Sequence, residues 1–221
     1  MRPFPGYKDR MTKARFITIE GGEGAGKSTL QRGLVAALAA ADIDALATRE
    51  PGGAPGAEEI RRLLVEGAPE RWDAVSEALL MVAARRCHLR ETIQPALAAG
   101  RWVVSDRFAD STLAYQGYAG GVPLEELRQL HRLIAGDVMP DLTLILDLPV
   151  ELGLKRAGTR PGAETRFERK DRGFHERLRQ GFLDIARREP GRCVVLDAAA
   201  PAETVQAAAL AALRERLQAA V

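Results

Sequence analysis

Residues 21–29, Gly21-Gly-Glu-Gly-Ala-Gly-Lys-Ser-Thr29, decide the fold. They follow a short apolar, β-branched stretch at residues 15–20 and precede a helical pattern that continues to about Ala41. The spacing Gly-x4-Gly-Lys-Ser between a strand and a helix is the pattern of a phosphate-binding loop, or P-loop. Glycines let backbone N–H groups turn toward phosphate oxygens, and the helix that follows adds the positive end of its dipole. We therefore predict a nucleoside triphosphate site here.

Two side chains of the P-loop have their own expected roles. Lys27 has the length to reach the terminal phosphates of a nucleoside triphosphate, and the Ser28 hydroxyl is suited to bind Mg²⁺. The motif alone does not separate a kinase from a GTPase or a motor ATPase. The residues expected to contact the triphosphate are Gly21, Gly22, Glu23, Gly24, Ala25, Gly26, Lys27, Ser28 and Thr29.

The rest of the chain alternates between strand and helix signals. Further strands are predicted at 44–48, 102–105, 142–147 and 193–197, and helices at 57–65, 73–99 and 202–220. Short apolar strands between longer helices indicate an α/β fold. We expect the three-layer P-loop NTPase fold, in which a five-stranded parallel sheet has helices on both faces. Residues 1–13 are expected to form a flexible tail, and 14–221 a single domain.

Length, composition and charge exclude several classes of protein. The chain has 221 residues, 46% hydrophobic and 28% charged, which fits one ordinary globular domain. It contains no stretch of 18 apolar residues and only two cysteines, so we expect neither a membrane span nor a disulfide scaffold. A net charge of +2 argues against a protein that coats nucleic acid. The expected location is the reducing cytoplasm.

Polar residues follow the second and third predicted strands, at the sheet edge where α/β proteins bind ligands. The two segments are residues 48–53, Thr-Arg-Glu-Pro-Gly-Gly, and residues 106–117, Asp-Arg-Phe-Ala-Asp-Ser-Thr-Leu-Ala-Tyr-Gln-Gly. Arg49 and Arg107 are suited to bind one phosphate from two sides, and Asp106 to hold Mg²⁺ together with Ser28. Tyr115 and Gln116 suit a base or a sugar, although a surface ion pair for Arg49 and a core position for Tyr115 remain open.

Taken in order, GGEGAGKST, TREPGG and DRFADSTLAYQG resemble the bacterial thymidylate kinases. The stretch LLMVAARRCHLRETIQPAL is also similar to their long substrate-side helix, and the resemblance runs from about Arg15 to the C-terminus. It implies transfer of the γ-phosphoryl group of ATP to thymidine 5′-monophosphate (dTMP) with Mg²⁺, giving the diphosphate for dTTP biosynthesis. It also implies a mobile lid, placed here at about 157–173, and a homodimer packed helix against helix.

The resemblance implies a role for individual substrate-binding residues. Glu23 would accept the sugar 3′-hydroxyl, Tyr115 would pack under the deoxyribose, and Glu50 would help to organise Mg²⁺ and its waters. The monophosphate would lie on Arg49 and Arg107. The base would be contacted by Arg61, Arg85, Thr112 and Gln116, with Met81 at the position where the family usually stacks an aromatic ring on thymine.

In this family the catalytic arginine comes from the P-loop or from the lid. The variable positions of this P-loop, residues 22–25, carry no basic side chain, so the arginine is expected from the lid. Arg160 is placed first, Arg156 second and Arg166 last. The assigned catalytic residues are thus Lys27, Arg107, Arg160, Arg156 and Glu50, and the Mg²⁺-binding residues are Ser28, Asp106 and Glu50.

The same sequence features also bear on other functions. Another nucleoside or deoxynucleoside monophosphate kinase would share the P-loop and the lid. A GTPase would need an Asn/Thr-Lys-x-Asp motif, which the sequence lacks, and a nucleic-acid motor does not fit the short, charge-balanced chain. A relative that binds nucleotides without catalysis remains an alternative. Alanine-rich faces near 73–99 suit either a dimer contact or an internal core.

Overall fold

The computed structural model describes residues 14–68, 70–159 and 166–221. Within them, five parallel strands form one sheet in the order β2-β3-β1-β4-β5. The strands are β1 (Phe16–Gly21), β2 (Ala45–Arg49), β3 (Trp102–Asp106), β4 (Leu142–Asp147) and β5 (Cys193–Asp197). The α/β prediction with a five-stranded parallel sheet is confirmed, and all five predicted strands start within one residue of the observed ones.

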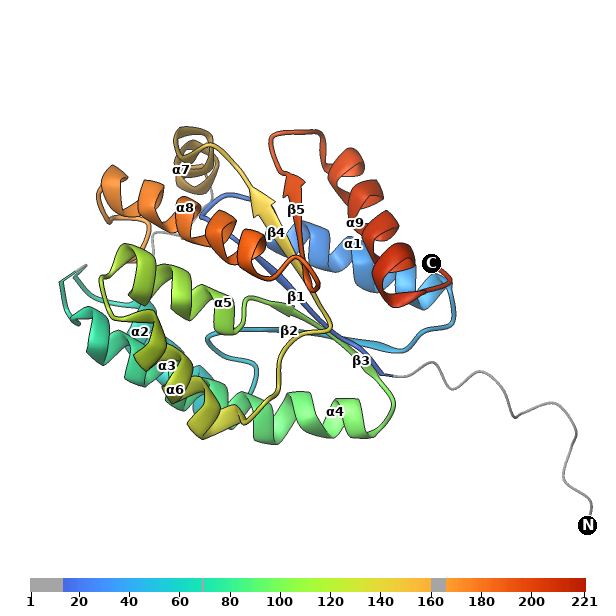
Figure 1. Cartoon of the computed structure of the whole chain (residues 1–221), viewed down its shortest axis with the longest axis horizontal. Coiled ribbons are helices and arrows are strands. Elements are labelled where there is room, and N and C mark those ends of the chain that lie inside the picture. The colour runs from blue at the N-terminus through green and yellow to red at the C-terminus, as the bar shows by residue number, and fades with distance from the viewer. Residues whose placement is uncertain (1–13, 69, 160–165) are drawn as a thin grey trace, which may run out of the picture.

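Helices cover both faces of the sheet (Figure 1). Side chains alternate along β1, so that Ile17 and Ile19 pack beneath α1 (Lys27–Ala40) and α9 (Ala202–Leu217) in one core. Phe16 points to the opposite face and packs in a second core with residues of β3 and of the segment after it. On that face α8 (Arg172–Arg188) covers β4 and β5. A strand that is apolar on both faces is typical of a buried parallel sheet.

The remaining helices surround the carboxyl ends of the strands and the β2–β3 side of the sheet. They are α2 (Pro55–Val65), α3 (Ala74–His88), α4 (Gln94–Ala98), α5 (Ala109–Thr112), α6 (Leu124–Ala135) and α7 (Val150–Gly158). Two π-helical turns, η1 (Leu89–Ile93) and η2 (Leu113–Ala119), join α3 to α4 and extend α5.

The helix predicted at 73–99 is therefore present but contains a wider turn at η1. Pro95 lies one turn later and supplies no N–H, and its ring crowds the carbonyl four residues earlier. A π-helical turn accommodates that crowding while the helix continues. As expected, the helix ends before Gly100, which has a φ of 80°.

Some expectations fall outside the described residues. These are the tail at 1–13, Arg160, and residues 160–165 of the predicted lid at 157–173. The flanks of that segment are described: α7 ends at Gly158, and α8 begins at Arg172. Across the described residues, no helix is both long and apolar enough to span a membrane.

Candidate nucleotide-binding and active site

Parallel pairing brings the predicted site segments to one edge of the sheet. β1 lies between β3 and β4, and Ile19 is in register with Asp106. Asp106 is also in register with Arg49 at the end of β2. The P-loop, residues 48–53 and residues 106–117 therefore leave the sheet side by side, as the sequence predicted.

The P-loop turns sharply before α1. Gly24 and Gly26 have φ values of 67° and 90°, a region that residues with a Cβ rarely adopt. The Lys27 ammonium folds back over the loop and donates to the carbonyls of Gly21 (3.2 Å) and Gly22 (2.8 Å). Burial, followed by repulsion from Arg107, lowers the pKa of Lys27 to about 8. Bringing an anion to this ammonium would favour its charged form.

Two of the three residues expected to bind Mg²⁺ are in contact: Ser28 at the start of α1 and Asp106 at the end of β3. The Ser28 hydroxyl donates to Asp106 Oδ2 over 2.9 Å. In the described part of the chain, no group of three His, Cys, Asp or Glu side chains could hold a metal ion. One hydroxyl and one carboxylate fit Mg²⁺ that keeps several waters and binds phosphate oxygens, which is its usual mode at phosphoryl-transfer sites.

Arg107 connects the P-loop to the segment after β3. Its φ is 73°, and its N–H donates to the Ile19 carbonyl over 3.0 Å. The guanidinium donates to Glu23 (3.2 Å) and to the Tyr115 hydroxyl (2.7 Å). It also donates to Gly21 O over 3.0 Å, so one side chain contacts both segments. Burial alone would lower the pKa of Arg107, but the acidic groups around it raise the value above its ordinary range.

Glu23 is the P-loop carboxylate that faces Arg107. The Tyr115 hydroxyl donates to the same oxygen, Oε1, over 2.5 Å. Burial would raise the pKa of Glu23, but the charges of Arg107 and Lys27 outweigh burial and lower it to about 2. Glu23 is therefore an ionised acceptor at neutral pH, which suits a bond from a hydroxyl group.

Glu20 is a site residue that sequence reasoning missed. Its carboxylate is fully buried at the end of β1 and accepts from the Phe108 N–H (2.7 Å) and the Ser111 hydroxyl (2.5 Å). These two bonds hold the segment that directly follows Arg107. Burial, and then the charge of Asp110, raise the pKa of Glu20 to about 8. The sequence could have indicated this role, because Glu20 is the one acidic residue in a mostly apolar predicted strand.

Arg85, Glu50 and His88 form a buried polar group behind the base-side cavity. Arg85 Nε donates to Glu50 Oε2 over 2.7 Å, and Nη2 donates to Phe108 O (3.0 Å) and Thr112 Oγ1 (2.9 Å). Within the described chain Arg85 Nη1 makes no hydrogen bond, and Arg85 is not among the residues that line the base-side cavity. Burial opposes ionisation of Glu50, but Arg85 and His88 lower its pKa.

His88 had no partner that the sequence could indicate. It is fully buried, with Nδ1 3.0 Å from Glu50 Oε1 and Nε2 2.6 Å from the Thr48 hydroxyl. Both oxygens of Glu50 are thus engaged by α3 side chains. These contacts fix the carboxylate beside the cleft.

Two adjoining cavities occupy this edge of the sheet. A cavity of about 110 Å³ is lined by the expected base-side and sugar-side residues, namely Glu23, Arg61, Met81, Thr112, Tyr115 and Gln116. An open cleft of about 760 Å³ is lined by Lys27, Ser28, Arg49, Asp106 and Arg156. Both are lined by Glu23, Glu50, Arg61 and Arg107. Arg107 therefore lies where a triphosphate in one cavity and a monophosphate in the other would meet.

Arg49 and Arg61 lie at the mouth of these cavities and bond to neighbouring protein groups. Arg49 is half-exposed, and its Nη2 contacts both oxygens of Glu58 at 3.1 Å. Arg61 donates to Pro51 O over 2.7 Å. Burial, and then repulsion from Arg49, lower the pKa of Arg61.

The described lid arginines occupy different places. Arg156, on α7, lines the open cleft and donates to Ala198 O over 2.9 Å. Arg166 is fully buried and forms an ion pair with Glu77 over 2.7 Å, so it lies away from the cleft.

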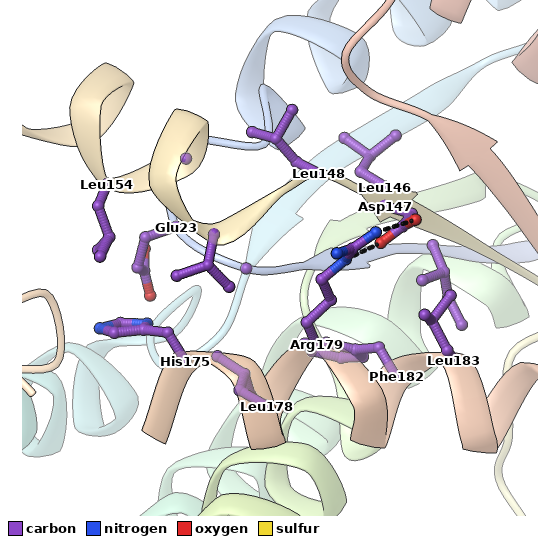
Figure 2. A pocket seen from close by; sticks show the side chains of 14 residues that line it. Glu23, Leu146, Asp147, Leu148, Leu154, His175, Leu178, Arg179, Phe182 and Leu183 are labelled. Carbon is purple, nitrogen blue, oxygen red and sulfur yellow. Dashed lines mark hydrogen bonds and ion pairs between the residues drawn. The ribbon is translucent and has the colours of Figure 1, made fainter. Parts of the chain in front are cut away.

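A third cavity lies behind the P-loop, between β4, α7 and α8 (Figure 2). Glu23 and His175 face each other at one end, and Arg179 forms two hydrogen bonds with Asp147 (2.6 and 2.9 Å) at the other. Its volume is about 20 Å³, which is room for a water molecule but not for a nucleotide. This cavity is therefore a packing gap behind the site.

Comparisons with known proteins agree with this geometry. The chain matches the thymidylate kinase family over residues 19–209. It is 56% identical over 207 residues to a thymidylate kinase of Caulobacter vibrioides, covering 94% of this chain and 99% of that one. It is 52% identical over 209 residues to a thymidylate kinase of Nitrobacter hamburgensis, covering 94% and 91%.

Among solved structures, the thymidylate kinase of Ehrlichia chaffeensis is similar to the whole fold. The TM-score is 0.72 at 35% sequence identity, over 90% of this chain and 98% of that one. The family match includes the P-loop and the residues that line the two cavities. The chain therefore belongs to the thymidylate kinase family.

Proposed function

We propose that this protein transfers the γ-phosphoryl group of ATP to dTMP, giving dTDP and ADP, as a step in dTTP biosynthesis. The observation that carries the proposal is the junction of two cavities at Arg107, one beside the P-loop and one lined by Tyr115, Gln116 and Met81. A kinase needs such a junction because donor and acceptor phosphates must meet. Family membership supports the same reaction.

The ATP half of the site consists of residues 21–29. Their backbone N–H groups and Lys27 would hold the β- and γ-phosphates. Ser28 and Asp106 would bind Mg²⁺, and Glu50 would orient its waters. When bound, the ion would draw negative charge from the phosphates and align them.

The acceptor half begins with the monophosphate between Arg49 and Arg107. Glu23 would accept a hydrogen bond from the sugar 3′-hydroxyl, in keeping with its depressed pKa. Tyr115 would pack under the deoxyribose, where its ring crowds a 2′-hydroxyl. This contact would favour deoxyribonucleotides.

Thymine would occupy the cavity behind the sugar. Arg85 Nη1 would donate to a thymine carbonyl, and Thr112 and Gln116 would bond to the edge of the base. Arg61 would lie near the base at the cavity mouth, and the Met81 thioether would pack on the ring face.

Catalysis would rest on position and charge. The acceptor phosphate is already an anion near neutral pH, so no strong general base is needed. Lys27 and Arg107 offset the repulsion between the two polyanions. A lid arginine, Arg160 or else Arg156, would add positive charge when the lid at 157–173 closes over the single domain and excludes water.

The direct test is a coupled ADP-release assay with ATP and Mg²⁺. dTMP, dUMP, dCMP, dAMP and dGMP are each supplied separately, with Lys27→Ala as the inactive control. Strong turnover with dTMP and much weaker turnover with the other nucleotides is expected. Preference for another monophosphate would support the alternative, a different nucleoside monophosphate kinase. No turnover with any of them would contradict the proposal.

We also propose that the protein is a cytoplasmic homodimer. Helices α2 and α6 each pack against α3, and the three helices leave large apolar side chains exposed. These are Leu63 (40%), Val75 (55%), Leu79 (52%) and Leu133 (80%). Val75 and Leu79 lie four residues apart and so share one side of α3. Exposed apolar side chains gathered on one side of a helix are typical of a protein–protein contact. A second copy of the chain is the partner that the helix-to-helix dimers of the family support.

A further inference from the structure

Gln116 has one polar atom without a partner at the base-side cavity. Its side chain is fully buried and lines the cavity. Nε2 donates to Glu77 Oε2 over 3.0 Å, whereas Oε1 has no hydrogen-bond partner among the described residues. A buried amide oxygen usually finds a donor, so Oε1 is available to a ligand N–H.

Glu77 determines which end of the Gln116 amide faces the cavity. A carboxylate only accepts hydrogen bonds, so the NH₂ group must point toward Glu77 and the oxygen away from it. Glu77 is itself held, because its Oε1 pairs with Arg166 over 2.7 Å.

Arg166 has little freedom to move. Its guanidinium also donates to the carbonyls of Leu64 (3.3 Å), Ala68 (3.2 Å) and Trp72 (3.5 Å). Glu77 is therefore fixed from one side by Arg166, and Gln116 is fixed by Glu77.

We propose that Glu77 is a specificity-determining residue that orients Gln116 as a hydrogen-bond acceptor for the N3–H of thymine. The inference rests on the proposed dTMP kinase function. Thymine carries a donor at N3, whereas cytosine carries an acceptor there. An amide oxygen fixed toward N3 would bond to thymine and uracil and repel cytosine. The 5-methyl group plays no part in this selection.

The test variant is Glu77→Gln, which keeps the size of the side chain. Arg166 still requires an acceptor, so the new amide oxygen faces Arg166 and the new NH₂ faces Gln116. Gln116 then turns over and presents its own NH₂ to the cavity, where cytosine N3 accepts it. The ratio of kcat/KM for dTMP to that for dCMP is expected to fall at least tenfold, with kcat/KM for dCMP rising above the wild-type value.

Two controls distinguish a changed orientation of the Gln116 amide from a general loss of structure. The dTMP:dUMP ratio is expected to stay unchanged in Glu77→Gln, because both bases carry N3–H. Asp147→Asn makes the same chemical change in another arginine pair, Asp147 with Arg179, and is expected to keep the dTMP:dCMP ratio. If folded Glu77→Gln keeps its dTMP:dCMP ratio within twofold of wild type, the inference is wrong.

The wild-type protein gives an independent measurement if the variant does not fold. The side-chain NH₂ signal of Gln116, assigned by its loss in Gln116→Met, is expected to exchange slowly with solvent both before and after dTMP binds. A large shift of that signal on binding would mean that the NH₂ contacts the base, and would overturn the inference. If wild type lacks dTMP turnover altogether, the proposed function fails first.

Discussion

Arg107 joins the two cavities through its guanidinium, which contacts the Gly21 carbonyl, Glu23 and Tyr115. Replacing it with alanine removes the proposed phosphate contact and leaves Glu23 without its ion-pair partner. We expect kcat/KM for dTMP to fall at least 100-fold in Arg107→Ala, about 2.7 kcal/mol. The measurement is steady-state kinetics at saturating ATP.

Arg101→Ala is the matched control for this prediction. Arg101 forms an ion pair with Asp44 over 2.8 Å just before β3, at the end of the sheet away from the site. Its loss is expected to leave kcat/KM unchanged. Near-normal turnover in Arg107→Ala would refute the phosphate-binding role of Arg107.

Met81 lines the base-side cavity, where the proposed function places the thymine ring. A phenylalanine there would add ring–ring stacking of about 1 kcal/mol. We expect Met81→Phe to lower KM for dTMP by about fivefold while KM for ATP stays constant. Unchanged or weaker dTMP binding would contradict this role for Met81.

Glu20 is expected to make the free energy of unfolding decrease as pH rises. Its pKa is raised from the ordinary 4.5 to about 8, so between those values the folded state holds a proton that the unfolded state has lost. The stability due to this group is present below about pH 4.5 and is lost as pH rises toward 8. Glu20→Gln removes the titration and should reduce the fall in unfolding free energy across that window.

Urea unfolding at pH 5, 6, 7 and 8 measures this effect. In wild type, Glu20 can lower the free energy of unfolding by up to about 1.4 kcal/mol for each pH unit. Glu20→Gln is expected to lack this contribution. Glu203→Gln, an exposed change on α9, is expected to leave the slope as in wild type. An equal slope in wild type and Glu20→Gln would show that Glu20 does not titrate in this range.

Sequence reasoning identified residues that line the two cavities more readily than residues that support them from behind. Lys27, Asp106 and Arg107 belong to contiguous motifs, so local spacing was enough. Glu77 contacts Gln116, which lies 39 residues away in the sequence. His88 contacts Glu50, which lies 38 residues away. Such contacts depend on how α3 packs, and neither residue type nor spacing encodes that.

At the scale of elements, the P-loop rests directly on α7. A Cβ at Gly153 would lie 2.5 Å from the Glu23 carbonyl, and one at Gly24 would lie 2.0 Å from the Gly153 carbonyl. Both neighbours are backbone, so a side chain at either position must displace the loop. We expect Gly153→Ala to lower kcat/KM for ATP at least tenfold, measured with dTMP saturating.

The same helix supplies the control for this substitution. Gly158→Ala adds a Cβ with nothing within 4 Å and should keep kcat/KM at the wild-type value. Equal kinetics in both variants would mean that α7 does not position the P-loop.

The strands were predictable because each is a short apolar run between polar turns. The π-helical turns η1 and η2 were not, since wider turns have no distinct hydrophobic period. η2 (Leu113–Ala119) carries Tyr115 and Gln116, and both side chains face the base-side cavity. The position of these two side chains in the base-side cavity thus depends on a π-helical turn, which hydrophobic periodicity does not predict.

At the scale of the whole molecule, the sheet separates two kinds of surface. The cationic and carboxylate side chains of the site lie at the edge formed by the carboxyl ends of its strands. The exposed apolar side chains of α2, α3 and α6 do not line that cleft. Figure 1 shows these helices on one side of the sheet. α3 takes part in both, because Met81 lines the base-side cavity and Leu79 is exposed. A contact on this face would therefore stiffen the helix that supports the base-side cavity.

This arrangement leads to a prediction about assembly. Leu79 and Leu133 are 52% and 80% exposed on the same face, and burying them in a dimer would remove apolar surface from water. A charge at either position opposes that burial. We expect Leu79→Glu and Leu133→Glu to sediment as monomers at concentrations where wild type has twice the chain mass. Val195→Glu, on the edge strand β5, is the control that should remain dimeric. A monomeric wild type would refute the dimer, and retained dimers in both leucine variants would place the contact on another face.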